Sequence, residues 1–145
     1  MIALIQRVTQ ASVSVEGVTV GAIGPGLLAL VAVQPDDDEA RIARMAERLL
    51  EYRVFADSQG RMNLSLADAG GGLLLVSQFT LAADTRKGRR PSFTTAASPE
   101  QAERGFNRLV ALCRQLHPGV EIGRFGAHMS VELINDGPVT FWLES

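Results

Sequence analysis

Apolar positions in the first third of the chain follow the spacing of β-strands. Residues 1–8 alternate loosely, and the Val, Ser and Thr runs that follow lie on either side of Glu16-Gly17, a pattern typical of a β-hairpin. The segment 25–33, PGLLALVAV, is apolar without interruption, which favours a strand buried on both faces. This part of the chain is therefore predicted to be β-structure.

Two later segments have helical spacing instead. In the first, 35–53, aspartates precede a stripe of apolar residues on one helical face, and the negative charges suit the amino end of a helix. The second, 98–117, begins with Ser98 as the N-cap and Pro99 at the first helical position. Gln101 completes the pattern of a capping box. Each segment predicts one amphipathic helix.

The remaining apolar runs are short, and the segment 82–97 between them has no periodicity, which predicts a loop. An Asp-Gly-Pro turn at 136–138 predicts a hairpin between the last two runs. The chain of 145 residues shows no repeat or linker, so we expect one mixed α/β domain, 1–145, with a β-rich body and two main helices. The further strands are predicted at 73–81, about 120–125, 129–134 and 139–144.

Composition and charge narrow the class of protein. The net charge of −2 argues against a general nucleic-acid coat, because such domains are usually strongly basic. The single cysteine, Cys113, allows no intrachain disulfide. No apolar run is long enough to span a membrane, and the first residues lack the pattern of a signal peptide. We therefore expect a soluble, cytoplasmic protein.

The usual catalytic residue patterns are missing. Ser77 does not lie in a Gly-x-Ser-x-Gly motif, and Cys113 falls on the apolar face of the second helix, where a core role is favoured. Of the two histidines, His117 lies at a helix end, where a cation suits the dipole, and a base role for His128 is the weaker interpretation. Two histidines without a carboxylate cluster predict no metal site.

Four stretches remain as candidates, and each has a purely structural alternative. Polar residues at the end of an apolar strand indicate either a site or a strand that leaves the core. A cluster of cations predicts either phosphate contacts or a solvated loop. A Gly-Pro turn is either functional or only a turn, and paired glycines suit either a close approach or a tight hairpin. The polar residues at the strand end are Ser77-Gln78-Phe79-Thr80, and the cluster of cations is Arg86-Lys87-Gly88-Arg89-Arg90. The turn is Gly137-Pro138, and the paired glycines lie in Gly123-Arg124-Phe125-Gly126.

Taken in order, these motifs resemble the D-aminoacyl-tRNA deacylase family, historically called D-tyrosyl-tRNA deacylase. The resemblance covers the whole chain and is carried by SQFTL (77–81), DTRKGRRPSF (84–93), GRFGA (123–127) and NDGPVTF (135–141). It implies a deacylase-like fold with a barrel-like β body and a homodimer with active sites at the subunit interface. It also implies hydrolysis of the ester that joins a D-amino acid to the 3′ end of tRNA, without a metal or organic cofactor.

The family's site carries over to this chain in two parts. Ser77, Gln78, Phe79 and Thr80 of one subunit would face Gly137-Pro138 of the other, whose peptide bond is cis in the family. Main-chain carbonyls there would accept from the substrate's α-ammonium, and the rigid turn would exclude an L side chain. Glycine has no side chain to exclude, so cleavage of glycyl-tRNA, including mischarged glycyl-tRNA(Ala), is expected.

Catalysis and binding complete these expectations. The 2′-OH of the terminal adenosine would assist water, and the Phe79 N–H would stabilise the oxyanion. Thr80 is either a pocket residue or, alternatively, a nucleophile. Arg7 would orient the Gly-Pro turn, and Phe125 and Met129 would pack near the adenine or that turn. The predicted contacts with acceptor-stem phosphates are Arg86, Lys87, Arg89 and Arg90.

Three other functions would fit parts of the pattern. A non-catalytic tRNA-binding module would bind tRNA in a salt-dependent way without cleaving the ester. A dimeric small-molecule sensor would have no tRNA affinity. An esterase that uses Thr80 or Ser77 as nucleophile would form an acyl-enzyme.

Overall fold

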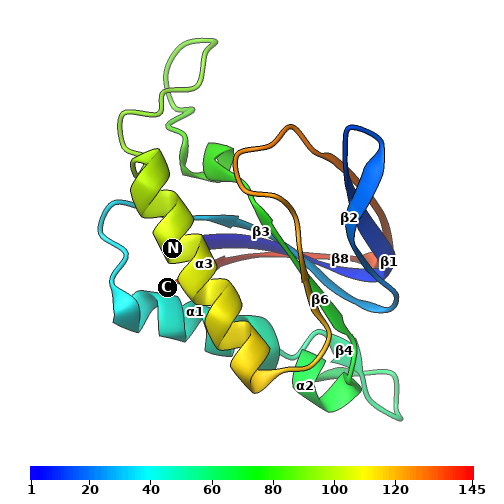
Figure 1. Cartoon of the computed structure of the whole chain (residues 1–145). Coiled ribbons are helices and arrows are strands. Elements are labelled where there is room, and N and C mark those ends of the chain that lie inside the picture. Colours follow the sequence, from blue (N-terminus) through cyan, green and yellow to red (C-terminus); the bar gives the residue numbers. More distant parts are fainter.

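The computed structural model describes all residues from Met1 to Ser145. Its two long helices, α1 (Glu39–Glu51) and α3 (Pro99–Leu116), lie on the same face of a curved sheet, and the loop before α3 projects away from the body (Figure 1). A short helix α2 (Leu66–Ala69) and a 3-10 helix η1 (Phe79–Ala82) complete the helical part. The strands are β1 (Ile2–Val15), β2 (Val18–Ile23), β3 (Gly26–Ala32), β4 (Phe55–Ala56), β5 (Met62–Leu64), β6 (Gly72–Ser77), β7 (Val120–Ile122) and β8 (Ser130–Glu144).

The long strand β1 is the centre of a six-stranded sheet. One of its edges pairs antiparallel with β3 and then β2, and the other edge pairs antiparallel with β8. Beyond β3, strands β6 and β7 continue the sheet in parallel. The mixed α/β, β-rich class predicted from the sequence is confirmed, and so is the β1–β2 hairpin, where Glu16 and Gly17 both have positive φ.

The sheet curls until strands from its two ends approach each other. Gly21 of β2 lies against β7, and a Cβ atom on Gly21 would be 2.6 Å from the carbonyl oxygen of Ile122. Any side chain would push these strands apart, so glycine permits the close approach. The result is the barrel-like body that the resemblance to the deacylase family implied.

The main core fills the space between the sheet and the two long helices. In β3 and β6 the residues alternate between the two sheet faces, and Leu27, Ala29, Leu73 and Leu75 face the helices. Phe106 of α3 is 2% exposed in this core. None of the helices combines the length and the apolar character that crossing a lipid bilayer requires.

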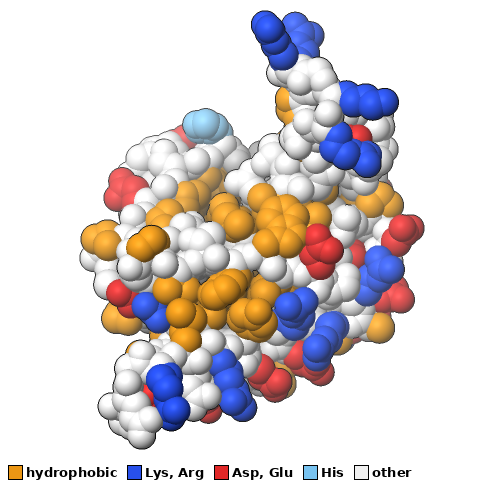
Figure 2. All heavy atoms as spheres, turned by 180° about the vertical axis from the view of Figure 1, so that it is seen from behind, with side chains coloured by type: hydrophobic (Ala, Val, Ile, Leu, Met, Phe, Trp, Pro, Cys, Tyr) orange, Lys and Arg blue, Asp and Glu red, His pale blue; other side chains and the backbone are white.

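The opposite face of the sheet is also apolar but only partly covered. Leu28, Leu74 and Val76 alternate with the core residues and form a second, smaller cluster. Its neighbours Met129 and Leu133 are only half-buried. Seen from behind, apolar side chains gather near the middle of the molecule, below the projecting loop with its Lys and Arg side chains (Figure 2). We call this second cluster and its half-buried neighbours the apolar sheet face.

Three predictions of local structure are wrong in detail. The strand predicted at 73–81 ends at Ser77, because the chain turns into η1 and the Phe79 ring packs on Phe93, 5.1 Å between centroids. The hairpin predicted at 136–138 is absent, since β8 runs continuously from Ser130 to Glu144 along β1. The capping box of α3 is half-formed: Ser98 accepts from the Gln101 N–H, but the Gln101 side chain donates to the Pro35 carbonyl.

Candidate active site

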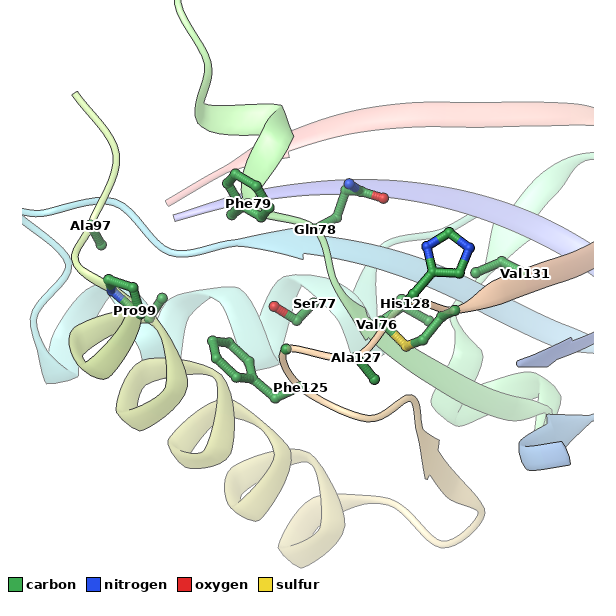
Figure 3. A pocket seen from close by; sticks show the side chains of 13 residues that line it. Val76, Ser77, Gln78, Phe79, Ala97, Pro99, Phe125, Ala127, His128 and Val131 are labelled. Atoms are coloured by element: carbon green, nitrogen blue, oxygen red, sulfur yellow. The ribbon is translucent and has the colours of Figure 1, made fainter. Parts of the chain in front are cut away.

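The parallel strands β6 and β7 end at the same edge of the sheet, and a pocket of about 410 Å³ opens there. The segment after β6 forms one wall, and the loop between β7 and β8 forms another (Figure 3). The amino end of α3, with Ala97 and Pro99, lies at the rim. Because the N–H groups at a helix start carry partial positive charge, this end of α3 favours negative charge in the pocket.

Five residues with a predicted catalytic or substrate-binding role meet in this pocket, beside Gly126 of the candidate stretch 123–126. They come from two segments that are far apart in the chain, the end of β6 and the loop before β8. The five are Ser77, Gln78, Phe79, Phe125 and Met129. Thr80 is the next residue after Phe79, is exposed, and accepts a hydrogen bond from the Gln78 side chain.

Phe79 occupies an unusual position for an aromatic residue. Phe79 is 56% exposed and lines the pocket, and its ring packs on the ring of Phe93. It is also the first residue of the 3-10 helix η1. The first N–H groups of a helix have no partner within the helix, so the backbone here presents donors to an incoming ligand.

The interior side of the pocket is apolar and well supported. The ring of Phe125 packs on Phe106 of the core, 6.3 Å between centroids. The sulfur of Met129 accepts a hydrogen bond from the Arg124 N–H at 3.3 Å. These contacts hold a hydrophobic surface that suits a flat or apolar group of a ligand.

Few ionisable side chains are available for chemistry near the pocket. His128 is the one that lines it, and its side chain is exposed. His117 lies at the end of α3, as predicted; it is buried, and its Nε2 lies 2.8 Å from the Gly71 carbonyl oxygen. Burial raises the pKa of Cys113 to about 12, so the thiol stays protonated at neutral pH. No group of three or more His, Cys, Asp or Glu side chains is arranged to hold a metal ion.

Gly137 and Pro138 are not among the residues that line this pocket. They lie in an irregular part of β8, where Val8 of β1 pairs with Asn135 and Gln6 pairs with Thr140. The residues between Asn135 and Thr140 therefore bulge out of the ladder. The Gly137-Pro138 peptide bond is cis, and both residues are exposed.

Arg7 fixes this bulge to the body of the protein. Its Nε atom donates to the Asp136 carbonyl oxygen at 3.2 Å and lies 3.1 Å from the Asp136 carboxylate. Its Nη1 atom donates to the Val54 carbonyl oxygen at 2.6 Å. Arg7 thus contacts Asp136, which directly precedes the Gly-Pro pair, and its role in orienting that pair stays a prediction.

Three further residues whose side chains hold the bulge were missed in the sequence: Gln6, Asn135 and Thr140. The Asn135 side chain accepts from the Val139 N–H at 2.9 Å and donates to the Thr140 hydroxyl at 2.9 Å. Gln6 also donates to that hydroxyl at 3.3 Å. The signal was available, because Asn135 and Thr140 flank the Gly-Pro pair symmetrically in NDGPVT.

The four predicted phosphate-binding cations differ in the structure. Arg86 forms an ion pair with Asp84, 2.7 Å between Nη2 and the carboxylate. The other three are exposed and form no ion pair: Lys87, Arg89 and Arg90. They lie in the loop before α3, which projects away from the body (Figure 1).

Comparison with known sequences gives the family. Residues 4–144 match the family model described as D-Tyr-tRNA(Tyr) deacylase. The D-aminoacyl-tRNA deacylase of Stenotrophomonas maltophilia (strain K279a) is 72% identical over 144 residues, with 99% of each chain covered. The D-aminoacyl-tRNA deacylase of Azotobacter vinelandii (strain DJ / ATCC BAA-1303) is 68% identical over 145 residues, with 100% of each chain covered.

Solved structures agree with the fold. A c-Myc DNA unwinding element binding protein superimposes with a TM-score of 0.96 at 40% identity, covering 100% of this chain and 99% of that one. A probable eukaryotic D-amino acid tRNA deacylase superimposes with a TM-score of 0.83 at 19% identity, covering 99% of this chain and 98% of the other. The chain belongs to the D-Tyr-tRNA(Tyr) deacylase family. It is an enzyme, a hydrolase that acts as a D-aminoacyl-tRNA deacylase.

Proposed function

We propose that the enzyme works as a homodimer in which the pocket of one subunit is completed by the Gly137-Pro138 segment of the other. The observation that carries this proposal is the separation of the two parts within one chain. Ser77 and Phe79 line the pocket, whereas Gly137 and Pro138 do not, although both are exposed. A second copy on the apolar sheet face would cover half-buried residues such as Met129, which also lines the pocket.

Chiral selection then follows from main-chain atoms. The carbonyl groups of the Gly-Pro segment accept hydrogen bonds from the α-ammonium of any amino acid, so the contact does not depend on the side chain. In a D-amino acid the side chain points away from the segment, and in an L-amino acid it meets the segment. Arg7 and Asn135 hold the segment rigidly enough to make that collision costly.

The chemistry is attack of water on the ester carbonyl. The bond from the carbonyl carbon to the 3′ oxygen of the terminal adenosine breaks, and the amino acid and tRNA are released. The neighbouring 2′-OH of the tRNA assists the proton transfers, and the Phe79 N–H stabilises the developing oxyanion. Thr80 serves as a pocket residue in this scheme, and Phe125 and Met129 form the apolar surface beside the adenine.

The substrate range follows from the same geometry. Any D-aminoacyl-tRNA qualifies, and glycyl-tRNA, including mischarged glycyl-tRNA(Ala), is also cleaved because glycine has no side chain to collide. Lys87, Arg89 and Arg90 contact acceptor-stem phosphates, which provides affinity without base specificity. A tRNA substrate agrees with a cytoplasmic location.

Single-turnover hydrolysis of D-tyrosyl-tRNA and L-tyrosyl-tRNA, with chelator present, tests the activity and the filter together. We expect rapid loss of the D-ester alone and no effect of the chelator. Equal loss of both esters would refute the filter. Loss of the D-ester only after metal addition would refute the cofactor-free mechanism.

A complementation experiment tests the cross-subunit site. Phe79→Pro removes the proposed oxyanion donor, and Gly137→Ala disturbs the other half of the site. Co-expressed chains that pair at random form heterodimers with one intact site, so we expect about a quarter of the wild-type active sites from two inactive parents. A site built within one chain would give no recovery.

A further inference from the structure

Asp84 stands at the base of the cationic loop 85–91, which we call the basic arm. Its carboxylate accepts hydrogen bonds from the Arg86 backbone N–H at 3.0 Å and from Nε and Nη2 of the same residue at 2.9 and 2.7 Å. Its backbone pairs with Ser92 in both directions, at 2.9 and 3.0 Å. Asp84 therefore joins the outgoing and returning ends of the arm and fixes the first cation between them.

This arrangement separates Arg86 from the other cations of the arm. A carboxylate that receives two parallel N–H donors from one guanidinium forms the strongest kind of exposed ion pair. The hydrogen bonds from the Arg86 side chain hold the pKa of the Asp84 carboxyl well below its usual range, so it is charged at neutral pH. Lys87, Arg89 and Arg90 have no such partner, and the positive charge at the tip of the arm comes from them.

The base of the arm also contacts the pocket. Phe93 follows Ser92 directly, and its ring lies 5.1 Å from the ring of Phe79. The arm is thus held at its base by Asp84 and Ser92, and the next residue, Phe93, contacts Phe79 of the pocket wall. Asp84 itself is not one of the residues that line the pocket.

We propose that Asp84 and Arg86 form an internal clamp that positions the basic arm, so that Arg86 binds Asp84 and not a phosphate. The inference rests on the proposed function, because the ligand of the arm is the phosphate backbone of the tRNA acceptor end. Asp84 is a positioning residue: its side chain acts through Arg86 and does not contact the substrate, and its main-chain bonds to Ser92 remain when the side chain is replaced.

The clamp predicts an effect whose sign is opposite to that of simple electrostatics. If Asp84 only neutralised a phosphate-binding arginine, Asp84→Ala would free that arginine, tighten tRNA binding and steepen the salt dependence by about one phosphate contact. If Asp84 holds the arm, Asp84→Ala displaces Lys87, Arg89 and Arg90 instead. Binding of tRNA then weakens on the order of tenfold, and the salt dependence becomes shallower: the magnitude of the negative slope of log K against log salt decreases by about two.

The experiment measures binding of uncharged tRNA to the full-length protein between about 50 and 200 mM salt, for Asp84→Ala, Asp84→Asn and the wild type. Asp57→Asn is the matched control, because Asp57 binds the N–H groups of Gln59 and Arg61 and pairs with Arg61 in another loop. We expect the control to bind like the wild type. Asp84→Asn, which keeps one acceptor for the Arg86 N–H, should lie between the wild type and Asp84→Ala.

Hydrolysis of a minimal ester, 3′-O-D-tyrosyl adenosine, separates positioning from damage to the pocket. This substrate has no acceptor stem, so Asp84→Ala should cleave it at the wild-type rate, while KM for D-tyrosyl-tRNA rises with the loss of binding. Tighter tRNA binding, or an equal loss on both substrates, would overturn the clamp. Failure of the wild type to cleave either ester would refute the proposed function, and the tRNA binding data would still decide the clamp.

Discussion

Replacement of Gly137 by alanine is the most direct perturbation of the Gly-Pro segment. Gly137 has a φ of +137°, which residues with a side chain rarely adopt. A Cβ atom there would lie 2.6 Å from Cγ2 of Val139 and 3.0 Å from the Val139 nitrogen. Val139 is 8% exposed and β-branched, so it has little freedom to move aside.

The magnitude follows from two costs. An unfavourable φ costs about 1–3 kcal/mol, and an overpacked contact costs typically about 1–3 kcal/mol more. We therefore expect Gly137→Ala to lower the free energy of unfolding by about 2–6 kcal/mol, or to relieve the strain by moving the segment. In either case the carbonyl groups lose their position, and the single-turnover rate on D-tyrosyl-tRNA should fall at least about tenfold, equivalent to about 1.4 kcal/mol.

Urea unfolding and single-turnover hydrolysis measure the two effects. Gly60→Ala is a suitable control, because Gly60 also has a positive φ but nothing lies within 4 Å of its Cβ position. It should cost about 1–2 kcal/mol and leave the rate unchanged. Adding Val139→Ala to Gly137→Ala removes the closest clash and should recover part of the lost activity. A Gly137→Ala enzyme with wild-type stability, rate and selectivity would refute the reasoning.

The remaining predictions concern Arg7, Phe106 and Cys113. Arg7→Lys cannot reach Asp136 and Val54 together, so kcat for D-esters should fall while circular dichroism stays native; an unchanged kcat would contradict the role of Arg7. Phe106→Ala should lower the free energy of unfolding by about 3–5 kcal/mol in urea titrations and loosen Phe125. Burial raises the pKa of Cys113 from 9.0 to about 12, so the folded protein holds the thiol proton more tightly than the unfolded chain does. The contribution of the protonated thiol to the free energy of unfolding is therefore complete below pH 9 and is lost as the pH rises toward 12. Thermal unfolding above pH 9 should show this loss in the wild type and not in Cys113→Ala, and native Cys113 should resist alkylation at neutral pH.

The elements that were predicted well are those whose signals are local. The helix at 98–117 carries its own N-cap and apolar stripe, and the apolar strand 25–33 needs no partner to be recognised. The end of β6 was missed because Phe79 and Leu81 continue its apolar pattern. The contact that takes Phe79 out of the strand is with Phe93, which lies in a loop without periodicity.

In the candidate site, too, the residues with local sequence signals were predicted and the long-range contacts were not. The sequence motifs identified Ser77, Phe79 and Phe125, but only the adjacency of β6 and β7 explains why they line one pocket. The sequence NDGPVT predicted a hairpin because its turn residues are a local signal. The hydrogen bonds that keep this segment within β8 come from Arg7 and Gln6, which lie near the other end of the chain. The pairing of Arg86 was within reach of the sequence, since Asp84 lies only two residues away.

The pairing of β1 with β8 also determines when the sheet can be completed during synthesis. Strand β1 leaves the ribosome before its partners and is followed closely by β2 and β3, but roughly a hundred residues separate it from β8. At about 5–20 residues per second, its second edge stays open for on the order of 5–20 s during synthesis. An open strand edge on an apolar sheet invites pairing with other chains. Until β8 has been synthesised, that edge of β1 is therefore exposed to pairing with other chains.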